Sequence, residues 1–353
     1  MSDILSCERL KSSDINPSDS ASMVQPPQED NGKAHTNTKV PWEFAPILVA
    51  NNRERIDIVH RKTLLFARSN QTCAFRWRAD IAEWKNRPQL LQDRLDLVDN
   101  DPCFWQYFVP GADGFLTTNL NNNLGLANGT PVKLHSLTFS SNQQLQTVVA
   151  QIATSPPGSV ITLDEPPLSV NLEIGQALDS NGKDDISDKR KAQLQILKKM
   201  SIHPDEIVIP LPAMKSKTKA HSYSVHSLCG HGRAKTKDIF PFELAFAMTV
   251  HKAQGRTIPR VVLALSHRHN PQNQMTYASI YVALSRVEHS TDLKVLYHST
   301  GTHPGRMGLD YVTDLNHCVH VLDYYEGFDQ NGNGLWNAQN AITAKKLRLQ
   351  NTH

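Results

Sequence analysis

The chain has 353 residues, enough for about two domains, with 39% hydrophobic residues and a formal net charge of +3. Its five cysteines are scattered and form no C-x-x-C pair, which argues against a zinc module or a disulfide framework and indicates a reducing compartment. No apolar run reaches the length of a membrane span, and no apolar leader opens the chain. We therefore expect no membrane partner, no secretion and no metal site.

The first forty residues have the composition of a disordered segment. Residues 1–40 are rich in Ser, Asp, Asn, Pro and Gln and hold few large apolar side chains. Such a segment cannot bury enough surface to offset the entropy lost on ordering. Order is expected to begin near Trp42.

A strand followed by a helix is predicted next. Residues 46–50 form a short apolar run, and residues 53–66 place apolar side chains at helical spacing. Asn51 or Asn52 is expected to cap this helix. The helix start also carries Arg53 and Arg55, which are either nucleic-acid ligands or ordinary arginines on a solvated turn.

Residues 67–108 hold a set of aromatic side chains in a charge-mixed segment that we predict to be helical. Such a set either stacks on bases or fills a core, and we favour the core. The set consists of Phe75, Trp77, Trp84, Phe104, Trp105, Tyr107 and Phe108.

The middle of the chain alternates like a β-structure. Asn128-Gly129 predicts a tight turn with a strand after it, and residues 160–163 and 170–174 read as further strands. Asp164 and Glu165 follow the first of these strands and precede two prolines, so we interpret them as turn residues.

A basic segment follows, from residue 215 to 237. Its cations come with an aromatic residue, several histidines and no acid, which suits a loop along a phosphate backbone. A solvated loop without a partner is the alternative. The candidate DNA-binding lysines are Lys215, Lys217, Lys219, Lys235 and Lys237.

Residues 242–297 predict alternating helices and strands. Apolar residues from Leu244 to His251 recur at helical spacing, and Gly255 stands where a left-handed helix cap is common. Residues 261–265 predict a buried strand, 275–286 a helix and 293–297 another strand. Ligands of such α/β sheets bind at the carboxyl ends of the strands, so polar residues there are placed for phosphates or nucleic acid.

Two runs in this region, Met248-Thr-Val-His-Lys-Ala-Gln-Gly255 and Tyr281-Val-Ala-Leu-Ser-Arg286, resemble motifs V and VI of RecD-type superfamily 1 DNA helicases, the Pif group in particular. The resemblance implies that Arg286 is a catalytic arginine finger, a role that suits its rigid, permanently charged fork. It also implies that Gln254 and Gly255 couple the nucleotide side to DNA. Further DNA contacts are implied for Thr249, His251 and Lys252.

Earlier segments extend the resemblance. The helix start with Asn52 and Arg55 resembles motif IV, and Leu126-Ala-Asn-Gly-Thr130 resembles the hairpin that enters a small inserted barrel. The implied fold is α/β: one RecA-like lobe with a mostly parallel sheet flanked by helices, an inserted small β-barrel and a disordered N-terminus. The expected segments are a head (1–40), the lobe start (41–118), the barrel with the basic loop (119–238), the rest of the lobe (239–298) and an irregular tail (299–353).

The phosphate-loop pattern G-x-x-x-x-G-K-[ST] is absent from the 353 residues. The resemblance therefore implies the carboxyl-terminal part of an ATP-dependent, 5′ to 3′ DNA helicase of repair, recombination, replication or transposon type, located in the nucleus or another intracellular compartment that holds DNA. ATP and magnesium are expected only in a complete two-lobe enzyme. The expected partners are single-stranded DNA and a missing first lobe. The alternative is a non-enzymatic nucleic-acid-binding helicase relic or a gene fragment.

Overall fold

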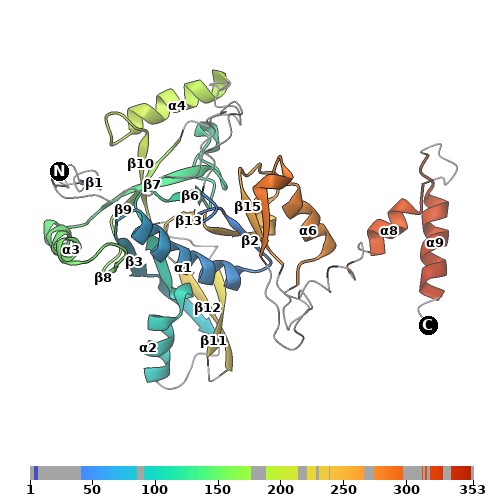
Figure 1. The fold of residues 1–353 in the computed structure, drawn as a ribbon, viewed down its shortest axis with the longest axis horizontal. Helices are drawn as coiled ribbons and strands as arrows, with labels where there is room; N and C mark the ends of the chain where they lie inside the picture. The colour runs from blue at the N-terminus through green and yellow to red at the C-terminus, as the bar shows by residue number, and fades with distance from the viewer. Residues whose placement is uncertain are drawn as a thin grey trace, which may run out of the picture. The chain divides into compact units, whose positions relative to one another are not determined.

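The computed structural model divides into two compact units, residues 1–252 and 253–353, and each is described by itself. Figure 1 shows the elements in chain order. The structure describes residues 4–6, 41–85, 91–175, 188–213, 221–227, 230–237, 239–265, 274–296, 312, 315, 319–328 and 335–350.

An antiparallel sheet forms much of the core of unit 1. Its strands run in the order β10 (Val208–Pro212), β9 (Ser169–Glu173), β7 (Pro131–Thr138), β6 (Asp113–Leu116) and β13 (Phe242–Leu244). A short β1 (Ile4–Ser6) pairs with β7. Helices α3 (Asn142–Thr154) and α4 (Asp188–Met200) follow β7 and β9 in the chain. The turn predicted at Asn128-Gly129 is confirmed, since Gly129 has a φ of +92°, the backbone N–H of Thr130 donates to the Ala127 carbonyl at 3.0 Å, and β7 begins at Pro131.

Two smaller sheets complete unit 1. One contains β5 (Trp105–Phe108), β3 (Ala74–Arg78) and β8 (Val160–Leu163), and the short 3-10 helix η2 (Pro102–Phe104) leads directly into β5. The other joins β4 (Asp80–Lys85) to the hairpin of β11 (His221–Ser227) and β12 (Gly230–Lys237). The remaining elements here are α2 (Leu91–Asn100) and η3 (Asn122–Leu124).

The aromatic set of residues 67–108 is core. Phe75, Trp77, Phe104, Trp105, Tyr107 and Phe108 are all buried, and the side chain of Trp84 lies outside the described residues. Trp77 meets Phe240 edge to face with ring centroids 5.4 Å apart. Such contacts add to the free energy gained by removing each ring from water, so the core interpretation is confirmed for the six described side chains.

A parallel pair of strands supports the long helix of unit 1. β2 (Ile47–Val49) lies beside β14 (Ala247–Thr249), and α1 (Asn52–Ser69) begins directly after β2. Asn51 caps the helix, because its Oδ1 accepts the backbone N–H of Glu54 at 3.0 Å. The face with Val59, Thr63 and Ala67 is buried. Both elements and the cap confirm the prediction for residues 46–66.

Unit 2 contains a second parallel pair. β15 (Val261–Ala264) lies beside β16 (Leu293–Leu296), with α6 (Tyr277–Leu284) and η5 (Ser290–Asp292) between them in the chain. Later, α8 (Val319–Tyr325) and α9 (Ala338–Gln350) contact each other, and Arg348 Nη1 lies 3.2 Å from Asp323 Oδ1. In the described residues no helix combines the length and apolarity needed to cross a bilayer.

The predicted α/β class is confirmed, since parallel strand pairs stand beside helices in both units. Several local predictions are wrong. Residues 242–249 form β13 and β14 rather than a helix, because their apolar side chains are buried on strands that pair with β6 and β2. The segment 67–108 contains the helix α2, but six of its seven aromatic residues stand on β3, β4 and β5 and not on a helix, because residues two apart on a strand point to the same face of the sheet.

Other differences concern the two ends of the chain and its middle. The basic segment forms the β11–β12 hairpin where it is described, since backbone ladder bonds pair residues 221–227 with 230–237. The tail forms α8 and α9 instead of irregular structure, because their helical faces pack together. Residues 4–6 form a strand, and the rest of the head lies outside the described residues. The strand predicted at 160–163 exists, but it pairs with β3 and not with β9.

Candidate functional site

The carboxyl ends of β2 and β14 bring two of the singled-out segments to one edge of unit 1. The strands are parallel, and their last residues, Val49 and Thr249, are paired in register. The chain after β2 enters the capped start of α1, and the chain after β14 enters the single-turn helix α5 (Val250–Ala253). Open α/β sheets bind their ligands at such an edge.

Glu243 connects the charged residues of this edge. Its Oε2 lies 3.4 Å from Arg55 Nη1, and the same oxygen accepts a hydrogen bond from Lys252 Nζ. Arg55 Nε also donates to Asn52 Oδ1 at 3.2 Å. The exposed fractions of the Arg55 and Glu243 side chains are 9% and 13%, so this ion pair is screened little by water.

The backbone around Glu243 is tightly fixed. Gly114 of β6 pairs with Leu244 of β13, and a Cβ on Gly114 would lie 2.8 Å from the Glu243 carbonyl oxygen. A glycine is therefore required for the two strands to approach this closely. Lys252 Nζ also lies 5.5 Å from the ring centre of Phe115, the next residue of β6. We define Arg55, Glu243 and Lys252 as the Glu243 cluster.

A second charged group anchors the start of α1. Arg53 Nη1 lies 2.7 Å from both oxygens of the buried Asp101, and Arg53 Nε lies 3.3 Å from Asp57. Burial lowers the pKa of Arg53, but the hydrogen bond and charge of Asp101 outweigh it, so the pKa is raised. The ion pair of Arg53 with Asp101 thus joins the start of α1 to η2.

The neighbouring Cys103 is buried beside an acid, surroundings that disfavour the thiolate. Burial raises the pKa of the Cys103 thiol, and the charge of Asp101 raises it further. A cavity of about 90 Å³ lies beside it, lined by Arg55, Tyr107 and Glu243 among others. Small-molecule sites usually measure roughly 300–1,000 Å³, so this cavity is too small for a nucleotide.

The motif residues at the end of β14 and just after it differ in exposure. Thr249 is 8% exposed, whereas His251 is exposed and Lys252 is half-buried. Phosphate-contacting groups need access to solvent. At this edge His251, Asn52 and the outer part of Lys252 are therefore accessible to solvent.

In unit 2, Arg286 follows α6 and is held by its own surroundings. Its Nε donates to the Val282 carbonyl at 2.8 Å and its Nη1 to the Arg256 carbonyl at 3.2 Å. Its Nη2 donates to Ser285 Oγ at 2.8 Å. The carbonyl of Arg286 accepts the backbone N–H of Ile258 at 2.8 Å. These bonds join the end of α6 to the loop after α5.

That loop contains the other two motif residues of unit 2. Gln254 and Gly255 are exposed, and Gly255 has a φ of +75°, the left-handed conformation predicted for it. No other atom lies within 4 Å of a Cβ built on Gly255, so its requirement for glycine comes from the backbone and not from crowding.

The basic segment contributes less to the described site. Lys215, Lys217 and Lys219 lie outside the described residues. Lys235 and Lys237 stand in β12, opposite Glu83 and Asp80 of β4 in the strand register, and their side chains are not described.

Sequence reasoning missed Glu243 and Asp101, the acidic partners of the predicted cations. Glu243 stands between two apolar residues, Phe-Glu-Leu, and Asp101 is followed by Pro-Cys-Phe, which is a weak signal of a buried ion pair. The partners stand 188 and 48 residues apart in the chain, from Arg55 to Glu243 (243 − 55) and from Arg53 to Asp101.

No protein-family model matches the chain, and no curated protein matches its sequence. Similar solved structures include Pif1 helicases from a study of forked-DNA unwinding (15% identity, 83% of this chain, 46% of that chain, TM-score 0.38). Others are Candida albicans Pif1 helicase (15%, 79%, 51%, 0.36) and Bacteroides Pif1 bound to single-stranded DNA (14%, 84%, 48%, 0.38). The chain spans about half the length of these structures.

Proposed function

We propose that this chain is the carboxyl-terminal part of an ATP-dependent DNA helicase and that it contributes one side of a single-stranded DNA track. The observation that carries the proposal is the shared edge of β2 and β14. There the motif IV-like residues follow β2 and the run from Thr249 to Lys252 follows from β14, and these two strands are parallel neighbours. The resemblance of the sequence runs and this geometry support the same role for the edge.

The Glu243 cluster suits a phosphate backbone in charge and in rigidity. Two cations share one carboxylate, which leaves a formal charge of +1 at the edge (+2 − 1). Because the carboxylate holds both cations in place, the strand would meet a preorganised surface and not two free side chains. Each phosphate neutralised would release counterions, which makes binding sensitive to salt.

Arg286 is proposed as the arginine finger of the complete enzyme. Its guanidinium would have to exchange carbonyl partners for phosphate oxygens, and phosphate offers stronger, charge-assisted bonds. The chain lacks a phosphate loop, so we expect it to hydrolyse no ATP alone. ATP, magnesium, the first lobe and a nuclear location belong to this proposal of a complete enzyme.

The test is fluorescence anisotropy with labelled oligo-dT and purified full chain. We expect weak binding that Lys252→Ala weakens by about threefold to tenfold, since one phosphate contact is lost. Lys345→Ala, on exposed α9, is the matched control and should bind like the original protein. Equal binding by both variants would overturn the assignment of this edge.

ATP hydrolysis is measured on the same preparations with and without oligo-dT. We expect none above buffer. DNA-stimulated turnover that Arg286→Ala abolishes would contradict the proposal that a second lobe is needed.

A second candidate is a nucleic-acid-binding protein without catalysis. It is favoured by the hydrogen bonds that hold Arg286 to Val282 and Arg256, since these give the residue a structural role. An upstream reading frame that encodes a phosphate loop would support the helicase, and an unrelated expressed frame would support this second candidate.

A further inference from the structure

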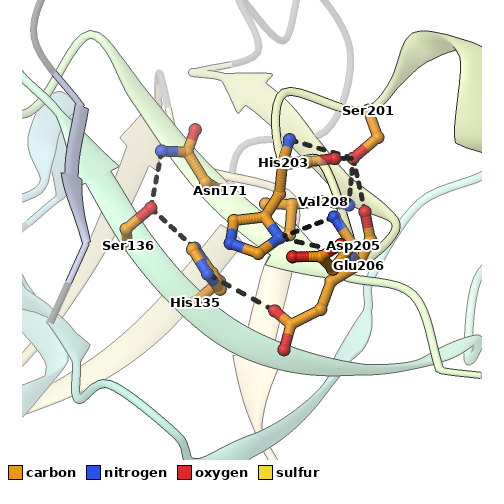
Figure 2. Close-up of polar contacts among 8 residues, drawn as sticks. All are labelled: His135, Ser136, Asn171, Ser201, His203, Asp205, Glu206 and Val208. Carbon is orange, nitrogen blue, oxygen red and sulfur yellow. Dashed lines mark hydrogen bonds and ion pairs between the residues drawn. The ribbon is translucent and has the colours of Figure 1, made fainter. Parts of the chain in front are cut away.

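A cluster of two histidines and a carboxylate lies on the antiparallel sheet of unit 1 and belongs to no motif described above (Figure 2). His135 stands in β7, and His203 and Glu206 stand in the segment between α4 and β10. Each offers one ligand atom, and the three atoms lie within 4.8 Å of one another. All three residues are half-buried. We propose that they bind a divalent metal ion of the zinc class.

The separation of the first two ligand atoms fits a shared ion. His135 Nε2 lies 3.5 Å from Glu206 Oε2. Two ligand atoms each about 2.0–2.2 Å from a tetrahedral zinc ion are about 3.4 Å apart. The observed distance needs almost no adjustment to hold an ion between them.

The second ring nitrogen of His135 has a hydrogen-bond partner, as metal-ligating histidines usually do. Nδ1 lies 2.9 Å from Ser136 Oγ, and the same hydroxyl accepts a hydrogen bond from Asn171 Nδ2 at 3.0 Å. Asn171 is fully buried, so this chain of hydrogen bonds is fixed. When Nδ1–H donates to Ser136, the lone pair of Nε2 is presented towards Glu206.

The segment that carries the other two ligands is held at its centre. Ser201 Oγ lies 2.7 Å from the Glu206 carbonyl oxygen and accepts the backbone N–H groups of Val208 and His203 at 2.9 and 3.1 Å. These bonds place Glu206 before the protein meets a ligand. The segment is therefore ordered when the protein folds, and binding an ion need not order it.

His203 limits the affinity. Its Nδ1 accepts the backbone N–H groups of Asp205 and Glu206 at 3.3 and 3.1 Å, so the neutral ring carries its proton on Nε2. Binding an ion through Nε2 moves that proton to Nδ1 and turns both backbone groups to water. Asp205 is exposed, which keeps the loss small. We expect micromolar rather than nanomolar affinity.

The ligand set selects the class of ion. Two imidazoles and one carboxylate are typical of zinc sites that keep a fourth position for water. Calcium and magnesium prefer oxygen ligands, so they should bind far more weakly. The exposed fraction of Glu206 is 38% and that of His135 is 10%, so the open position faces solvent beside Glu206. A bound ion would tie the segment before β10 to β7.

The experiment is isothermal titration of the metal-free full chain with zinc chloride under reducing conditions, followed by cobalt(II) absorption spectra. The chain has 16 histidines and five cysteines, so background binding is judged by difference between variants. We expect one ion per chain whose affinity falls about tenfold or more in His135→Ala, His203→Ala and Glu206→Gln. The tetrahedral cobalt spectrum should disappear with it.

Two variants serve as controls. Asp205→Asn changes a carboxylate beside the cluster, and His289→Ala removes an exposed histidine of unit 2; both should bind zinc like the original protein. If His135→Ala does not fold, His203→Ala and Glu206→Gln still decide the matter. Zinc binding that none of the three replacements weakens would overturn the proposal, as would equal binding of magnesium.

Discussion

The Glu243 cluster and Arg286 carry the same kind of sequence signal but are held by different forces. Around Glu243, cations from α1 and α5 meet a carboxylate from β13, and the ion pair with Arg55 is largely removed from water. Arg286 instead bonds to the carbonyls of Val282 and Arg256 and to its neighbour Ser285. The first region depends on contacts between distant segments, and the second depends mainly on local backbone.

This difference teaches that a motif residue can be sensitive for two separate reasons. Removing one partner of a buried ion pair leaves an uncompensated charge, which costs several kcal/mol. Removing a half-exposed cation that bonds to carbonyl oxygens lowers the free energy of unfolding only by the net contribution of one or two hydrogen bonds, about 1 kcal/mol each. Loss of stability and loss of function should therefore be separable in the second region and coupled in the first.

The largest expected effect is on the Glu243 cluster. Glu243→Gln leaves Arg55 and Lys252 without their carboxylate, and we expect the free energy of unfolding to fall by about 3–5 kcal/mol. Urea denaturation followed by tryptophan fluorescence measures it, since Trp42, Trp77, Trp84 and Trp105 all lie in unit 1. Glu288→Gln, an exposed acid of unit 2, should change little. Equal effects of the two variants would remove the distinction between the regions.

A half-buried cation on α1 gives the next effect, which depends on pH. Lys62 Nζ donates to the Ala45 carbonyl at 2.8 Å, and burial lowers the pKa of Lys62 to about 8, against the opposing charge of Glu43. Between pH 8 and 10.5 the unfolded chain binds more protons at this site than the folded one, so stability rises with pH.

Because the group is partly exposed, we expect this rise to be about 1–2 kcal/mol. Urea midpoints at the two ends of that pH range measure it, and Lys62→Met should abolish the rise. Parallel pH profiles of the two proteins would show that Lys62 keeps its ordinary pKa.

The smallest stability effect is expected at Arg286. Arg286→Ala removes its bonds to Val282 and Arg256, and we expect the free energy of unfolding to fall by about 1 kcal/mol. Thermal unfolding monitored by circular dichroism measures this loss. Binding of oligo-dT should remain unchanged. A loss of DNA affinity larger than the loss of stability explains would place Arg286 on the DNA track.

Local signals predicted the elements that depend on local chemistry. Asn51 and the apolar face of residues 53–66 identified α1 and its cap, and Gly255 was predicted to be left-handed. The run 242–249 was mistaken for a helix, because short apolar segments fit a period of 3.6 as well as a buried strand. Only pairing with β6 and β2, both distant in the chain, decides between them.

The candidate sites were predictable only in part for the same reason. Arg55 and Lys252 were singled out from their segments, but Glu243, which joins them, gave no signal of its own. The cluster of His135, His203 and Glu206 was missed altogether, and no metal site was expected. His135 and His203 stand 68 residues apart (203 − 135) and show no metal-binding spacing, so only the approach of β7 and β10 through β9 reveals them.

The most direct test of the proposed DNA edge is the salt dependence of oligo-dT binding by the original protein and by Lys252→Ala. The logarithm of the association constant should fall linearly with the logarithm of salt concentration in both. We predict a slope shallower by about 0.7 in the variant, since one phosphate contact to a single strand is lost. Identical slopes would contradict the account, because Lys252 would then neutralise no phosphate.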